Sequence, residues 1–113
     1  MPRASSGRSV FDAVRTAARG LPNVEDCLYY GQPALKIDGK MFVCMASHSS
    51  AEPNSLVVRM DFPTRDACIA EQPDIYYLTD HYVGYTSVLV RLDRVPRDLL
   101  KALVHGAYRF MSR

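Results

Sequence analysis

The stretch "ALKIDGKMFVCMA", residues 34–46, decides the fold of this chain. Apolar residues run along both sides of Asp38-Gly39, a pair that supplies the positive φ angles required by a two-residue hairpin turn. The pattern predicts two antiparallel strands, with Ile37 opposite Lys40 across the ladder.

The register of that hairpin also predicts its further neighbours. We expect Leu35 opposite Phe42, and Lys36 near the hairpin tip together with Lys40. Outward along the chain, short apolar runs between turn residues predict a set of antiparallel strands. They cover residues 27–30, 34–37, 41–46 and 55–60.

Helical patterns flank and interrupt these strands. Ser9 followed by Asp12 resembles a capping box, so we predict a first helix over residues 9–20, after a disordered leader at residues 1–8. A short helix is expected at residues 63–73, with a small apolar face and Pro73 as its stop. That face consists of Ala67, Ile69 and Ala70.

The last segment predicts a helix that begins at Pro96. Gly106 inside it should let a neighbour approach closely, because glycine otherwise weakens a helix. The apolar stripe of this helix consists of Leu99, Leu100, Leu103, Val104, Ala107 and Met111.

A strand at residues 86–92 separates two sets of side chains. Val88, Val90 and Leu92 lie on one face, and Leu89 and Arg91 lie on the other, which suits a sheet exposed to water on one face. The order is helix, four strands, short helix, strand or hairpin, and helix. We therefore predict one α+β domain over residues 9–113, with an antiparallel sheet, N- and C-terminal helices and a short middle helix.

Composition limits the class of protein. With 113 residues, 48% of them hydrophobic and 23% charged, the chain can form one folded domain without disulfides. Cys27, Cys44 and Cys68 have no CxxC spacing, so we expect structural thiols and neither a metal nor a cofactor. No apolar run reaches the ~18 residues of a membrane span, and we expect a monomer in the cytoplasm.

Charge is distributed unevenly. The net charge is +2, but residues 20–90 carry four basic and nine acidic side chains, a net −5. A basic surface must therefore come from the terminal segments or from a few local residues.

No motif of catalysis is present. The sequence has no glycine-rich phosphate loop, no HExxH and no GxSxG, so we expect a protein that is not an enzyme. His81 beside Asp80 could be a general base, but a hydrogen-bonding structural role is the simpler interpretation. We expect His48 to be exposed and His105 to be partly buried or on the surface.

Tyrosines are concentrated around His81, at Tyr76, Tyr77, Tyr82 and Tyr85. They could alternate between core and rim with their hydroxyls hydrogen-bonded, stack on nucleic-acid bases, or line a site for a protein or a small molecule. The turn before the final strand cannot bury all of its rings, so at least one of Tyr82 and Tyr85 should be exposed.

Two stretches carry a family resemblance. "YYGQPALKIDGKMFVCM" and "YYLTDHYVGYTSVLVRL", in this order and followed by a last helix, resemble the MmcQ/YjbR family over residues 10–110. The resemblance implies a CyaY-like α+β fold whose hairpins act as wings proposed to bind DNA. The nucleic-acid-binding candidates are then Lys36, Lys40, Arg59, His81, Tyr82, Tyr85 and Arg91.

Those basic residues are few among nine acids, so the alternative stays open. It is a protein-interaction or small-ligand-binding module that uses the tyrosine-rich surface and no nucleic acid.

Overall fold

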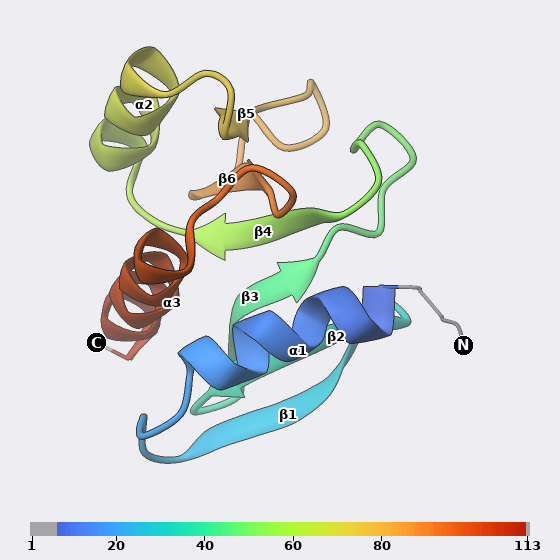
Figure 1. Cartoon of the computed structure of the whole chain (residues 1–113), viewed down its shortest axis with the longest axis vertical. Coiled ribbons are helices and arrows are strands. Elements are labelled where there is room, and N and C mark those ends of the chain that lie inside the picture. Colours follow the sequence, from blue (N-terminus) through green and yellow to red (C-terminus); the bar gives the residue numbers. More distant parts are fainter. Residues whose placement is uncertain (1–6, 113) are drawn as a thin grey trace.

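The computed structural model describes residues 7–112 and contains three helices and six strands (Figure 1). Of the predicted leader, residues 1–6 lie outside the described part, and Gly7 and Arg8 belong to the first helix. None of the helices within residues 7–112 is long and apolar enough to span a membrane. The elements are α1 (Gly7–Ala17), β1 (Val24–Tyr29), β2 (Gln32–Ile37), β3 (Lys40–Met45), β4 (Ser55–Arg59), α2 (Phe62–Glu71), β5 (Tyr76–Tyr77), β6 (Ser87–Arg91) and α3 (Arg97–Met111).

All six strands form one antiparallel sheet in the order β1-β2-β3-β4-β6-β5. This confirms the predicted α+β fold with terminal helices and a short middle helix. Of the two forms left open for the segment after α2, the hairpin is present, because β5 pairs with β6.

The Asp38-Gly39 turn is formed as predicted, with φ angles of 53° and 77°. Ile37 pairs with Lys40, but Leu35 pairs with Val43, so the expected pairing with Phe42 is wrong. A β-bulge between Leu35 and Lys36 changes the register, and Phe42 is the extra residue. Its ring is fully buried against Tyr108 of α3, which explains why the strand accommodates it.

Helices α1 and α3 cover one face of the sheet and form the main core with it (Figure 1). The apolar stripe of α3 is confirmed, with Leu100, Leu103, Val104 and Ala107 buried. The predicted capping box is wrong, because Ser9 already lies inside α1. The helix begins two residues before the serine, at Gly7.

Gly106 does not allow a close approach, and that prediction is also wrong. A Cβ atom built at this position would meet nothing within 4 Å. The glycine therefore weakens α3 without any packing reason in the described structure.

The prediction that the other face of the sheet is exposed to water is wrong in part. Leu89 is fully buried there, because the segments around Ala46 and Tyr82 fold back over the strand. This second cluster consists of Ala34, Met41, Cys44, Val57, Tyr82 and Leu89. The cover is incomplete, and it leaves a hollow between these segments and the β1–β2 hairpin.

Candidate functional site

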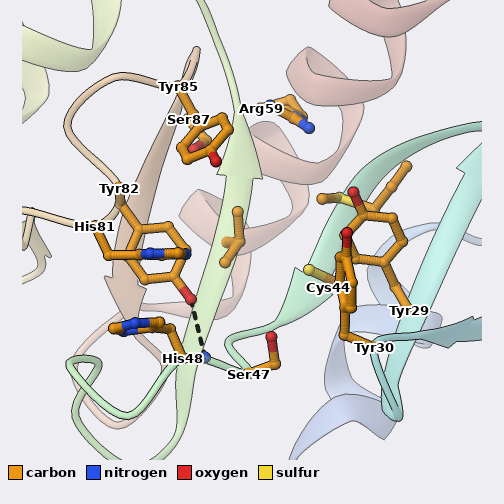
Figure 2. A pocket seen from close by; sticks show the side chains of 12 residues that line it. Tyr29, Tyr30, Cys44, Ser47, His48, Arg59, His81, Tyr82, Tyr85 and Ser87 are labelled. Atoms are coloured by element: carbon orange, nitrogen blue, oxygen red, sulfur yellow. Dashed lines mark hydrogen bonds between the residues drawn. The ribbon is translucent and has the colours of Figure 1, made fainter.

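The hollow is a cavity of about 520 Å³ on the sheet face opposite α1 and α3 (Figure 2). Strands β3, β4 and β6 form its floor, and two sets of rings form its walls. The lining residues are Tyr29, Tyr30, Met41, Cys44, Ser47, His48, Val57, Arg59, His81, Tyr82, Tyr85 and Ser87.

One wall comes from the turn that joins β1 to β2. Tyr30 and Gly31 form a second two-residue hairpin turn, with φ angles of 51° and 79°. Tyr30 is 80% exposed, and its ring contacts Tyr29 edge to face at 4.8 Å. A bulky residue in the left-handed region is uncommon and strained. Because the Tyr30 ring is exposed, its burial does not offset this strain.

The opposite wall contains two stacked histidines. The rings of His48 and His81 lie 3.7 Å apart and are nearly parallel, at 9°. Tyr82 is buried beside them, and its hydroxyl accepts a hydrogen bond of 3.3 Å from the His48 backbone N–H. Burial raises the pKa of Tyr82. Tyr85 is 52% exposed, which agrees with the expectation that one ring of this turn lies at the surface.

Most of the tyrosine cluster has structural roles. Tyr76 is buried in the main core, and burial raises its pKa to about 12. The Tyr77 hydroxyl accepts a 2.8 Å hydrogen bond from the Glu52 N–H, so Tyr77 and Tyr82 together anchor the loop that follows β3. In this cluster, Tyr85 presents the most exposed ring.

A buried arginine of α2 holds the wall that carries Tyr85. Nη1 of Arg65 donates hydrogen bonds to the backbone oxygens of Val83 at 2.9 Å and Tyr85 at 3.2 Å. The prediction of an apolar face on this helix was wrong in part, because Ala67 and Ala70 are exposed while Arg65 is buried. The short helix turns its arginine inward because those two carbonyl groups need donors.

Arg59 at the end of β4 is the charged residue of the cavity. Its Nε is buried without a hydrogen-bond partner, and among residues 10–112 no carboxylate forms an ion pair with its guanidinium. None of the described lining residues is acidic, although residues 20–90 as a whole carry a net −5. The cavity is therefore a local cationic site within an acidic segment.

The charge of Arg59 acts on the cavity floor. Burial raises the pKa of the Cys44 thiol to about 12, and the nearby Arg59 partly opposes this shift. Cys44 is thus a protonated thiol at neutral pH and a poor nucleophile. All three cysteines are free, and burial also raises the pKa of Cys27 and Cys68.

Arg91 has a different environment, although the sequence placed it among the same candidates. Its guanidinium makes two 2.9 Å hydrogen bonds to Glu52 and donates to the backbone oxygens of Pro73 and Asp74. It also lies 4.2 Å from the centroid of the Tyr77 ring. Arg91 therefore ties together three segments of the chain.

Of the predicted site residues, the structure brings together Arg59, His81, Tyr82 and Tyr85 around the cavity. Lys36 lies on the same sheet face, with its Nζ 5.8 Å from the Tyr29 ring centroid, outside the lining. Lys40 is exposed beside the Asp38-Gly39 turn.

Several lining residues were missed by sequence reasoning. They include Tyr29, Tyr30 and His48. His48 is exposed as expected, and His105 is partly buried with Nε2 3.0 Å from the Ala17 oxygen. Tyr30 could have been identified from the Tyr-Gly pair between two strand patterns. A two-residue turn requires positive φ angles, which glycine supplies readily. Within the described part of the chain, no group of three or more His, Cys, Asp or Glu side chains could hold a metal ion.

Comparison with known proteins identifies the family. A family model described as YjbR matches residues 19–110. The chain belongs to the YjbR family. A solved structure, Deinococcus radiodurans protein DR2400 with a domain of family DUF419, has the same fold, with a TM-score of 0.73 and 20% sequence identity. The match covers 90% of this YjbR-family chain and 78% of DR2400. No curated protein matches the chain.

Proposed function

We propose that this YjbR-family chain is a non-enzymatic binding module whose cavity holds a ligand with an acidic group. The observation that carries the proposal is Arg59, a half-buried arginine that lines the cavity and has no partner in the described structure. An arginine in this position is unfavourable alone, because a buried donor that lacks a hydrogen bond costs free energy. A carboxylate or phosphate group would supply the missing acceptor in a two-pronged pair, once a rotation of the Arg59 side chain turns the covered Nε toward the cavity.

The contrast with the other arginines of residues 10–112 that are buried or partly buried supports this assignment. Arg15, Arg65 and Arg91 each have a carboxylate partner, at 2.7, 3.0 and 2.9 Å. Arg59 faces a cavity in which no carboxylate competes for its charge. An anion that enters the cavity therefore meets an available cation and no repulsion from the lining.

The side chains of the cavity support binding rather than catalysis. The His48 Nδ1 accepts a 3.1 Å hydrogen bond from the Ser50 backbone N–H and lies 2.8 Å from the Ser50 hydroxyl, so this nitrogen closes a local turn. The Cys44 thiol is protonated at neutral pH. Neither group is prepared as a nucleophile with an adjacent free base.

DNA binding through the hairpins is a second candidate. It is supported by the exposed Tyr30 ring on one hairpin and the exposed Lys40 beside the turn of another. Its electrostatic support is smaller than the sequence suggested, because Arg91 is engaged by Glu52. A titration of duplex DNA at several salt concentrations tests it, since each phosphate contact should contribute ~0.9 to the salt slope.

Thermal denaturation tests the primary proposal. Phosphate should raise the melting temperature of the wild-type protein above that in chloride at equal ionic strength, because a ligand at ten times its Kd stabilises the folded state by about 1.4 kcal/mol. The Arg59→Gln variant should lose this difference, and the matched exposed variant Arg19→Gln should keep it. An equal phosphate effect in wild type and Arg59→Gln would place the anion elsewhere and overturn the proposal.

A further inference from the structure

The cavity has more room than an anion site requires. Its volume of about 520 Å³ lies within the range of small-molecule sites, whereas an inorganic anion on Arg59 would fill a small part of it. The remaining space is bounded mainly by rings. The ligand therefore has a larger body attached to its acidic group.

Those rings lie on two sides of the space. Figure 2 shows Tyr29 and Tyr30 on one side, and His48, His81, Tyr82 and Tyr85 on the other. Aromatic faces favour planar partners, because stacking adds to the burial of apolar area. A planar ring system is thus the body that suits these walls.

Tyr30 carries the strongest indication. A two-residue turn of this type favours asparagine, aspartate or glycine at its first position, and here a tyrosine has φ of 51° while its ring stays 80% exposed. Without a ligand, the strain and the exposed ring of Tyr30 lower the stability of the folded chain. Stacking on a ligand would cover more of the ring than its edge-to-face contact with Tyr29 does.

The polar groups indicate what joins the ring to the acid. Ser47 and Ser87 line the cavity together with Arg59, and their hydroxyls can donate to and accept from sugar hydroxyls. Among the described residues of the lining, Arg59 is the one permanently charged side chain, which suits one phosphate group rather than a chain of phosphates.

We propose that the cavity binds a free nucleoside monophosphate, with its base against Tyr30 and its phosphate on Arg59. This inference rests on the proposed function of Arg59 and adds the class of ligand. A strand of nucleic acid would present further phosphates on each side of the bound nucleotide, and the lining within residues 10–112 provides no other permanent cation to contact them.

Calorimetric titration of the full chain tests the ligand class. The probes are AMP, GMP, CMP and UMP, with ribose 5-phosphate as the ligand that lacks a base and indole-3-acetate as a ring that carries a carboxylate. At least one nucleotide should bind about 5-fold to 150-fold more tightly than ribose 5-phosphate, the factor expected from one stacked base. Indole-3-acetate should bind more weakly than that nucleotide.

The Tyr30→Asn variant separates the ring from the turn. Asparagine tolerates the positive φ angle, so the fold should be kept while the ring is removed. Nucleotide binding should then weaken about 5-fold to 150-fold, and ribose 5-phosphate binding should not change. Leu28→Thr is the matched control on the same hairpin, because Leu28 is 68% exposed. Its strand neighbours Cys27 and Tyr29 belong to the cavity face, so the Leu28 side chain lies on the opposite face of the sheet.

The outcomes distinguish this inference from the function on which it rests. If nucleotides and ribose 5-phosphate bind equally, and Tyr30→Asn changes neither while Arg59→Gln weakens both, the ligand class is wrong and the anion site stands. If no probe binds, and phosphate raises the melting temperature of Arg59→Gln as much as that of the wild-type protein, both proposals fail. Tighter binding of a single-stranded oligonucleotide or of indole-3-acetate than of every nucleotide would also overturn the proposed ligand class.

Discussion

Replacement of Arg59 by methionine should stabilise the protein while abolishing its binding of anions. Methionine fills a similar length with no donor, so the variant removes the buried Nε that lacks a partner. A buried unsatisfied donor costs about 1–3 kcal/mol, and the low end applies because the rest of the side chain is only half-buried. We expect a gain of about 1 kcal/mol, or about 4 °C in melting temperature for a domain of this size.

Thermal denaturation without ligand measures this gain. The control is Arg91→Met, which removes the hydrogen bonds to Glu52 and to two backbone oxygens and should lower the melting temperature. Opposite signs for the two variants would support the distinction between a ligand-binding and a structural arginine. A fall for Arg59→Met similar to that for Arg91→Met would refute it, because Arg59 would then stabilise the fold through contacts with the chain itself.

Three further predictions concern the fold and its thiols. Gly106→Ala should raise the free energy of unfolding in urea by about 1 kcal/mol, because the added Cβ meets no atom, and a decrease would show a hidden contact. Replacement of Asp38-Gly39 by Val-Val should lower the melting temperature, because both φ angles are positive; an unchanged value would contradict the observed turn. Burial raises the pKa of Cys44 from the usual 9.0 to about 12, so this thiol should resist a thiol reagent at pH 8 until denaturant is added; rapid labelling of the native protein at pH 8 would contradict this. The contribution of Cys44 to the free energy of unfolding should decline between pH 9 and 12, because the thiol ionises at lower pH in the unfolded chain than in the folded one.

The sequence predicted those parts of the fold that depend on neighbouring residues. Asp38-Gly39 determines its turn through backbone sterics, and the stripe of α3 follows from helical periodicity. The order of helices and strands was predicted for the same reason. The bulge at Leu35 was not, because it depends on the burial of Phe42 beneath a helix from the other end of the chain.

The cavity was predicted only in part, because it depends on contacts between distant segments. Tyr82 and His48 are 34 residues apart, and Glu52 and Arg91 are 39 apart. Without knowledge of these contacts, the sequence does not show that Arg91 is paired with Glu52 while Arg59 has no carboxylate partner. The role of Arg65 in the cavity wall was missed because Nη1 of this arginine bonds to backbone oxygens, which leave no pattern in the sequence.

The most direct measurement is the two-dimensional nitrogen–proton NMR spectrum, which includes the Nε–Hε group of Arg59. Addition of the nucleoside monophosphate that binds most tightly should shift the Arg59 Nε–Hε signal together with the backbone amides of Tyr30, Ser47 and Ser87, because these residues line one cavity. The Arg91 Nε–Hε signal, already bonded to Glu52, should stay in place. Amide shifts confined to residues 36–40 or to α3, with no change at Arg59, would contradict the account.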